Sequence, residues 1–240
     1  MSEILANIVA SNETAARTAA LNVEVIADLV CPFCYLGKRR LEQALLAVQG
    51  PSDVSWYPFQ LNPEIAQDGV RFDDYLTRRF GSLATVQPVL EGLTDEGKRE
   101  GIKFRFERIR RVPNTMHAHQ LMYLAEKLGK DQGLLAEDLM AAFFEHGEDI
   151  GETDVLVRLG ARHDLEKDKV LQIFDDEAAR RLILSREGQV RSSGIVGAPG
   201  FLLNRHLLLI GAQDADSMVN AFDRAMFGEG TDGLVSPALH

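Results

Sequence analysis

Cysteine is scarce in this chain, with two among 240 residues, at positions 31 and 34. A secreted domain that depends on disulfides carries more cysteines at wider spacings. A chain of this length buries a core large enough to fold without cross-links, and a bridge across so short a loop would restrict the unfolded chain little. The two thiols are therefore poor candidates for stabilisation and better candidates for reactivity.

Long apolar runs are also missing, and so is an excess of positive charge. No stretch approaches the ~20 residues of a membrane-spanning helix, and Glu3 stands where a secretory signal carries Lys or Arg. The 26 Lys and Arg residues are outnumbered by 36 Asp and Glu residues, which gives a net charge of −10, and an acidic surface repels nucleic-acid phosphates. We therefore expect a cytoplasmic protein with residues 1–20 as an N-terminal leader, and neither a membrane nor a nucleic acid as partner.

The chain opens with the pattern of a strand, a helix and a second strand. Alternating and β-branched residues over Asn22–Val30 predict a half-buried strand, and apolar residues at helical spacing over Tyr35–Gln49 predict a helix. Val54–Leu61 predicts a second strand, in which Pro58 argues against a central, fully hydrogen-bonded position. The sequence CPFC, residues 31–34, lies between the first strand and the helix.

From residue 63 to residue 188 the periodicity is helical. Helices separated by Gly, Pro and Asn are predicted at 73–80, 85–101, 115–128, 134–145, 153–163 and 167–186. Two short apolar runs, 200–204 and 206–210, then predict a hairpin, and 213–227 predicts a last helix before a C-terminal tail at 230–240. This order predicts an α/β fold in which a small mixed sheet carries a large helical insertion.

The CPFC turn places a thiol where a strand becomes a helix. A thiol attacks as the thiolate, and the unpaired N–H groups and positive dipole end of a helix N-terminus stabilise that form at Cys31. Pro32 suits the first helical turn, where an N–H would be unpaired. Cys34 follows about one turn later, close enough to attack a mixed disulfide formed at Cys31. We therefore expect Cys31 to be the more exposed, attacking thiol and Cys34 to be the more buried, resolving thiol.

Two other interpretations of the cysteine pair stay open. CxxC is half of a zinc site, but no second CxxC is present, and His117 and His119 point to different faces of their predicted helix. The thiols could also be inert and buried, which the strand–helix junction and Pro32 disfavour. We therefore expect no metal.

Three kinds of side chain near the cysteines have both a functional and a structural interpretation. Asp28, three positions before Cys31, is expected to cap the helix, and it could instead tune the thiols. His117 and His119 could shuttle protons, although histidines with a purely structural role are commoner. Phe33 could line a peptide groove or simply pack.

The CPFC segment and its surroundings resemble the FrnE-like branch of the DsbA family of thioredoxin-fold proteins. The run 28–39 carries the resemblance first. Further pieces follow in the family's order: 58–63, Asn114-Thr115 with Ala118-His119, 143–150, 194–201 and 211–213. The likeness covers 23–227. CxxC alone is weakly specific, whereas the ordered set is strongly specific.

The resemblance implies a thioredoxin-like domain made of 21–62 and 189–229, interrupted by an inserted helical domain at 63–188. It implies a cis-proline at Pro199 that faces the cysteines, at a strand start where a residue without an N–H is tolerated. In relatives that bind glutathione, the peptide pairs beside this proline and its γ-glutamyl end meets the last helix. The matching positions here are Ala198, Gln213, Asp214 and Asn62.

These features predict a thiol–disulfide oxidoreductase that reduces, forms or isomerises disulfides through Cys31 and Cys34. The expected partner is a disulfide-containing protein or glutathione disulfide. No tightly bound cofactor is expected, and glutathione is the candidate co-substrate. In a cytoplasmic setting a reductase or isomerase role is favoured over an oxidase role.

Two other function classes are considered. The first is a glutathione-dependent isomerase or transferase, like 2-hydroxychromene-2-carboxylate isomerase and the kappa-class glutathione transferases, which typically carry Ser at the position of Cys31. The second is a holdase that uses an apolar groove, and the presence of both cysteines argues against it as the only role. The sequence leaves the oligomeric state open, a homodimer included.

Overall fold

The computed structural model describes residues 21–228 and the backbone of 233–235, so the expected leader 1–20 lies outside the described residues. A five-stranded mixed sheet has the order β2-β1-β5-β6-β7. Its strands are β1 (Leu21–Ala27), β2 (Ser52–Pro58), β5 (Gly200–Leu203), β6 (Leu207–Ile210) and β7 (Gly233–Val235). Strand β1 pairs parallel with β2 and antiparallel with β5.

Two features of the sheet bear on the sequence expectations. Pro58 ends β2, which is an edge strand, as a proline without a donor N–H requires. The expectation of a plain tail at 230–240 is wrong for Gly233–Val235, which pairs parallel with β6 and extends the sheet. A three-residue strand is too short for a periodic signal, so pairing with β6 decided its structure.

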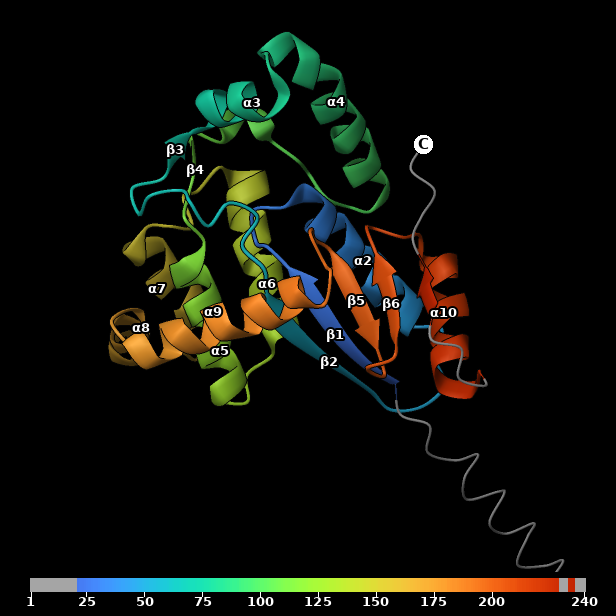
Figure 1. The fold of residues 1–240 in the computed structure, drawn as a ribbon. Coiled ribbons are helices and arrows are strands. Elements are labelled where there is room, and N and C mark those ends of the chain that lie inside the picture. Colours follow the sequence, from blue (N-terminus) through green and yellow to red (C-terminus); the bar gives the residue numbers. More distant parts are fainter. Residues whose placement is uncertain (1–20, 229–232, 236–240) are drawn as a thin grey trace, which may run out of the picture.

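Helices lie on both faces of the sheet (Figure 1). Helices α2 (Pro32–Leu45) and α10 (Ala215–Phe227) pack together on one face, and α9 (Glu177–Ser192) lies against β2 on the other. A small cluster of Ile26, Phe59, Val190 and Ile195 fills the space under α9. The CPFC helix is therefore held between the sheet and its neighbours.

The helical block follows β2. It comprises α3 (Phe72–Phe80), α4 (Leu83–Arg99), the short turn η1 (Phe106–Arg108), α5 (Met116–Lys127), α6 (Gln132–Ala141), the π-helical turn η2 (Ala142–His146), α7 (Thr153–Arg162) and α8 (Lys167–Phe174). Strands β3 (Val70–Arg71) and β4 (Arg111–Val112), which the sequence did not predict, form a separate two-residue ladder. Helices α3 and α4 make an arm above the rest of the block (Figure 1).

The segment expected as one helix at 167–186 is two helices, α8 and α9. The chain breaks at Asp175–Asp176 because the Asp176 carboxylate accepts from the N–H groups of Ala178 and Ala179 and so starts α9 afresh. An Asp begins a helix only when its side chain accepts a hydrogen bond from the backbone of the first turn. The sequence analysis missed this break because apolar residues keep a helical spacing on both sides of it.

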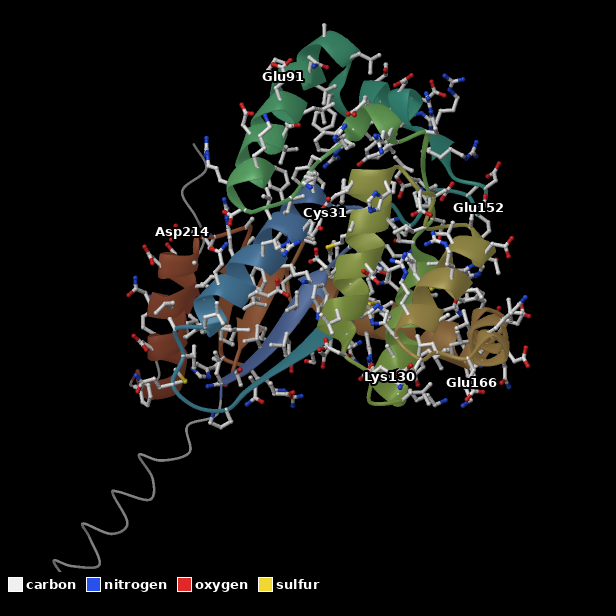
Figure 2. The ribbon with its side chains drawn as sticks, turned by 180° about the vertical axis from the view of Figure 1, so that it is seen from behind. Cys31, Glu91, Lys130, Glu152, Glu166 and Asp214 are labelled. Atoms are coloured by element: carbon white, nitrogen blue, oxygen red, sulfur yellow. The ribbon has the colours of Figure 1, made fainter. Side chains whose placement is uncertain are left out.

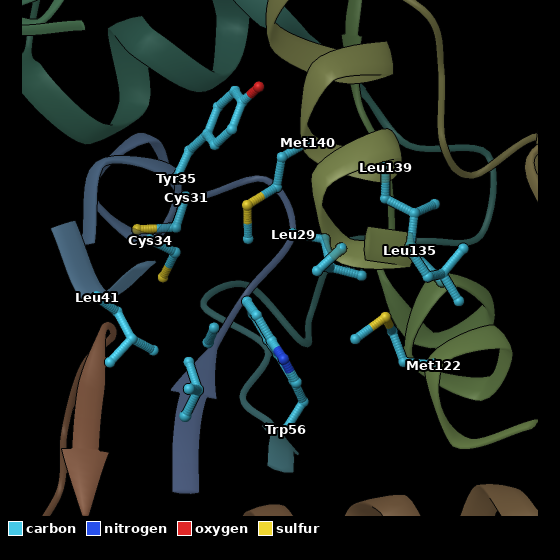
Figure 3. Close-up of a cluster of buried hydrophobic side chains, with 14 of the residues drawn as sticks. Leu29, Cys31, Cys34, Tyr35, Leu41, Trp56, Met122, Leu135, Leu139 and Met140 are labelled. Carbon is cyan, nitrogen blue, oxygen red and sulfur yellow. The ribbon is translucent and has the colours of Figure 1, made fainter. Parts of the chain in front are cut away.

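One buried apolar cluster joins the sheet to the helical block. It contains Leu29, Cys31, Cys34, Tyr35 and Trp56 from the sheet side (Figure 3). From the helical block it contains Met122, Leu135, Leu139 and Met140. The two parts share a core, so the division into 21–62 plus 189–229 and an insertion at 63–188 stays a prediction about ancestry and folding units.

Candidate active site

Cys31 is the residue that begins the helix of the CPFC motif. Strand β1 ends at Ala27, Cys31 keeps an extended backbone (φ −98°, ψ 116°), and Pro32 is the first helical residue. No side chain caps the first turn of α2. Pro32 has no N–H and the Cys34 N–H donates to the Cys31 carbonyl, so the Phe33 N–H is the one in this turn without an acceptor among the described residues. The sequence prediction of the helix start is confirmed. Figure 2 shows Cys31 at this end of α2, near the arm of α3 and α4.

Both thiols are free and buried. Cys31 is 3% exposed and Cys34 is 2% exposed, so both thiols are buried and the expected difference in exposure between them is only marginal. The arm of α3 and α4 and the shared core cover this end of α2, which the local sequence did not reveal. What distinguishes the two thiols is their surroundings.

Burial raises the pKa of the Cys34 thiol well above its ordinary value, and the neighbouring Cys31 raises it further. The Asp28 backbone N–H lowers that pKa, while the negative charge of the Asp28 carboxylate raises it. Cys34 is therefore held as a protonated thiol, the form that a resolving cysteine has before it attacks.

Asp28 is not a helix cap. Its carboxylate is 1% exposed, and Oδ2 accepts a hydrogen bond of 2.7 Å from the Leu61 N–H, which ties the β1 end to the loop after β2. Oδ1 lies 3.5 Å from Nε2 of His119, on α5. The capping expectation failed because Leu61, a residue distant in sequence, supplies a better placed donor.

The loop before β5 meets Cys31 from the opposite side. The Ala198–Pro199 peptide bond is cis, and the Ala198 carbonyl oxygen lies 3.7 Å from Cys31 Sγ. A Cβ at Gly37 would come within 2.9 Å of the Phe201 ring and 3.2 Å of Pro199 Cγ. The absence of a side chain at Gly37 thus lets α2 approach this loop closely.

The other expected binding residues fall in two places. Phe33 lies beside Cys31 in the turn and is 46% exposed, while Asn62 lies in the loop after β2. Gln213 turns inward, where its side-chain amide donates to the Ile210 carbonyl. Asp214 is exposed at the start of α10 (Figure 2).

Asp214 already has a structural role. Its carboxylate caps α10 by accepting from the Ser217 N–H at 2.8 Å, a hydrogen bond that also lowers the pKa of Asp214. One N–H that a glutathione carboxylate was expected to use is therefore taken, and the N–H groups of the first two helical residues are left. Arg40 fixes this loop to α2 by donating to the Ala212 carbonyl at 2.6 Å.

Sequence reasoning missed the polar contacts of Tyr35. Its phenolic oxygen lies 2.7 Å from Glu137 Oε1 and 2.8 Å from Glu145 Oε1. Glu137 also accepts from Lys38 and Arg39. These contacts bind α2, through Tyr35, Lys38 and Arg39, to α6 and the π-helical turn η2. Only the basic run 38–40 hinted at acidic partners.

Sequence reasoning also missed Tyr75, on α3. Burial raises the pKa of Tyr75, a hydrogen bond with Asn62 and the charge of Arg79 lower it, and Cys31 and Asp28 raise it. The hydrogen bond with Asn62 joins α3 to the loop after β2.

The two histidines have separate surroundings. His119 is buried beside Asp28, whereas His117 stacks on Phe174 with ring centroids 4.6 Å apart and contacts Gln67. Across residues 21–228, no group of three or more His, Cys, Asp and Glu side chains is arranged to hold a metal ion. No helix in the described part of the chain is long and apolar enough to cross a membrane.

Comparisons with known proteins agree on one family. A family model described as the DSBA-like thioredoxin domain matches residues 22–223. The protein YwbO of Bacillus subtilis (strain 168) is 27% identical over 140 residues, which are 58% of this chain and 64% of that protein. The match therefore spans slightly less than two thirds of YwbO.

Solved structures have the same fold. The probable DsbA oxidoreductase of Streptomyces coelicolor has a TM-score of 0.80 at 27% identity, covering 90% of this chain and 94% of its own. 2-hydroxychromene-2-carboxylate isomerase has a TM-score of 0.63 at 13% identity, and the cytosolic disulfide reductase DsbM of Pseudomonas aeruginosa, crystallised with GSH, has 0.54 at 18%. Each covers 85% of this chain and 95% of its own. The thioredoxin-like fold with a helical insertion is confirmed.

Proposed function

Since this chain belongs to the DSBA-like thioredoxin domain family, a family of oxidoreductases, we propose that it exchanges thiols and disulfides through Cys31 and Cys34. One observation carries the proposal. Two free thiols share the first turn of α2, and the carbonyl before Pro199 lies 3.7 Å from Cys31 Sγ, where a substrate chain can pair beside the attacking sulfur.

The proposed reaction begins with Cys31. Its thiolate attacks one sulfur of the substrate disulfide, and the other substrate sulfur leaves with the electron pair of the broken S–S bond and takes a proton. A mixed disulfide between Cys31 and the substrate results. The open N-terminus of α2 stabilises the attacking thiolate.

Cys34 then resolves this intermediate. Its proton passes to the Asp28 carboxylate, whose buried Oδ1 has no hydrogen-bond partner among the described residues. The new thiolate attacks the Cys31 sulfur, the bond to the substrate breaks, and the substrate sulfur departs with the electron pair. The chain is left with a Cys31–Cys34 disulfide, which two thiols of reduced glutathione reduce again as they become glutathione disulfide.

Glutathione is proposed as the co-substrate in a cytoplasmic setting, where thiols are kept largely reduced. Its backbone would pair with Ala198, and its γ-glutamyl end would reach the first turn of α10 near Asp214 and Gln213. Phe33 and Asn62 would flank the cysteinyl part. A structure of similar fold, DsbM, was crystallised with GSH, which supports this choice.

Turnover of a disulfide tests the proposed function. The wild-type chain should reduce a protein disulfide or a small disulfide other than glutathione disulfide when glutathione and glutathione reductase recycle it, and Cys31→Ser should abolish the activity because a hydroxyl is no substitute for a thiolate. A wild-type chain that reduces neither substrate, but isomerises a chromene-type substrate with glutathione, would show the alternative isomerase function.

Calorimetric titration tests the glutathione site. Reduced glutathione at millimolar concentration should release heat with the wild-type chain, and Asp214→Ala should weaken binding. Asp216→Ala is the matched control, because Asp216 lies in the same first turn and has no described hydrogen bond. Equal binding by wild type and Asp214→Ala would remove α10 from the site.

A further inference from the structure

Asp28 and His119 are a buried pair that the reaction above uses only in part. Asp28 Oδ1 and His119 Nε2 are both buried, neither has a hydrogen-bond partner in residues 21–228, and they lie 3.5 Å apart. That distance is slightly longer than a hydrogen bond. Buried polar atoms are nearly always paired, so each exception needs an explanation. A proton taken up by either group would supply the missing bond.

His119 also lines a cavity of about 20 Å³ between β2, α5 and α9. A water molecule needs roughly 10–15 Å³ and at least two polar partners. Trp56 lines the same cavity, and its Nε1 is a buried donor with no partner among the described residues. The indole N–H and the His119 ring thus offer a water two partners. Trp56 belongs to the same buried cluster as Cys34 and Met122 (Figure 3). Met122 also lines the cavity.

An ion pair closes the cavity toward solvent. Arg186 donates to both oxygens of Glu126, at 2.6 and 3.1 Å, and both side chains are partly exposed. The Arg186 guanidinium also lies over the rings of Tyr57 and Tyr123, at 5.8 and 5.5 Å from their centroids. The outer wall is therefore polar and charged, and a proton in the cavity can leave through it.

We propose that His119 relays the Cys34 proton from Asp28 to one water in this cavity, from which it reaches solvent past Glu126. This inference rests on the proposed function. The proton moves from Cys34 Sγ to Asp28 Oδ1 and then to His119 Nε2, and the ring releases the proton of its other nitrogen to the water. No electrons move in these steps, and His119 acts on the reaction through Asp28.

Titratable groups face this route from every side. Asp28 and Cys34 lie on the side of the redox pair. The groups on the other elements packed around His119 are Tyr57 of β2, Tyr123 and Glu126 of α5, and Arg186 of α9. The route therefore couples the redox pair to the helical block, because α5 carries the relay.

Single-turnover kinetics test the relay, because they separate the attack by Cys31 from resolution by Cys34. His119→Gln should slow resolution at least about tenfold, at the lower edge of general acid–base effects, and leave the attack within twofold. The pH profile of resolution should change while that of the attack does not, a difference that a merely structural role would not produce. His117→Gln, on the same helix but facing Gln67 and Phe174, should change neither step.

A second variant covers the case in which His119→Gln fails to fold. Trp56→Phe keeps one aromatic ring at this position and removes the pyrrole part with its N–H, so the water loses a partner and resolution should slow severalfold with the attack unchanged. Resolution at the wild-type rate and pH profile in the folded variants would overturn the relay. A wild-type chain that forms no mixed disulfide would instead overturn the proposed function.

Discussion

At the scale of single residues, the two cysteines differ in electrostatic setting and hardly at all in exposure. Both are buried, yet Cys34 is held as a thiol by burial and by its neighbours. Cys31 instead lies at the N-terminus of α2, where the Phe33 N–H has no acceptor among the described residues and the helix dipole has its positive end. The division of labour therefore follows from position in the first helical turn.

We predict that the two cysteine variants fail at different steps. Cys34→Ser should still attack but stall as a mixed disulfide with the substrate, because the intramolecular thiol that releases it is gone. Cys31→Ser should trap nothing. Mass spectrometry of the quenched reaction measures the adduct, and alkylation below neutral pH should label Cys31 before Cys34. Faster labelling of Cys34 would reverse the assigned roles.

We predict that Asp28→Asn lowers the pKa of Cys34, because the negative carboxylate that raises it is removed while burial and the Asp28 N–H remain. Asn can still accept from the Leu61 N–H, so the fold should persist. Resolution should nevertheless slow, because the proton acceptor is lost. Ultraviolet titration of the thiolate in Cys31→Ser and in Cys31→Ser/Asp28→Asn measures the shift. A Cys34 pKa that rises or stays constant would contradict this account.

At the scale of elements, α2 is fixed by one close approach to the sheet side and by polar contacts with the helical block. The close approach is Gly37 against Pro199 and Phe201. The polar contacts join Tyr35, Lys38 and Arg39 to α6 and η2. Arg40 adds ion pairs with α4. Together they hold the redox turn at the junction of the two parts.

Gly37→Ala should destabilise the chain by about 1–2 kcal/mol. Overpacking against the buried Phe201 ring costs about 1–3 kcal/mol, and the gain in helix propensity returns about 0.5–1 kcal/mol. Gly188→Ala is the matched control, since its Cβ would meet nothing within 4 Å inside α9, and it should stabilise by about 0.5–1 kcal/mol. Urea denaturation measures both, and equal shifts would mean that α2 and the Pro199 loop are not in tight contact.

Tyr35→Phe should lower the free energy of unfolding by about 2 kcal/mol. A hydrogen bond to a charged group contributes about 1.5–3 kcal/mol, and among the described contacts Tyr35 is the hydrogen-bond partner of Glu145. Tyr123→Phe is the control, because the Tyr123 ring stays under Arg186 and its hydroxyl has no described hydrogen bond. Equal stability of the two variants would show that Tyr35 does not attach α2 to the helical block.

At the scale of the whole molecule, the stability of the reduced protein should depend on alkaline pH. The pKa of the Cys34 thiol is higher in the folded chain than in the unfolded chain, where a cysteine has a pKa of about 8.5. The contribution of this thiol to the free energy of unfolding is fully present below the unfolded pKa. It is lost as the pH rises above that value, because the unfolded chain releases a proton that the folded chain keeps. The loss is at most ~1.4 kcal/mol per pH unit.

Denaturation under reducing conditions between about pH 7 and about pH 9.5 measures this effect, below the range in which Tyr35 adds its own. Cys34→Ala lacks the titrating thiol and should show a flatter curve. If the wild type and Cys34→Ala lose stability in parallel over this range, the effect does not arise from Cys34.

The sequence by itself determined the redox motif, the strand–CPFC–helix–strand opening, the late hairpin and most helices. Periodicity, Pro32 and the CxxC spacing act over a few residues, and such local signals survive without any knowledge of the fold. The family resemblance added the proline that faces Cys31, a position no local pattern could connect with the cysteines.

Only the tertiary structure decided which distant polar groups meet. It placed Leu61 and His119 on Asp28, put Glu137 and Glu145 on Tyr35 from 102 and 110 positions away, and added β7 to the sheet. It also buried Cys31. The physical reason is that hydrogen bonds between single polar side chains have no period in the sequence, and burial depends on what the rest of the chain packs above a residue.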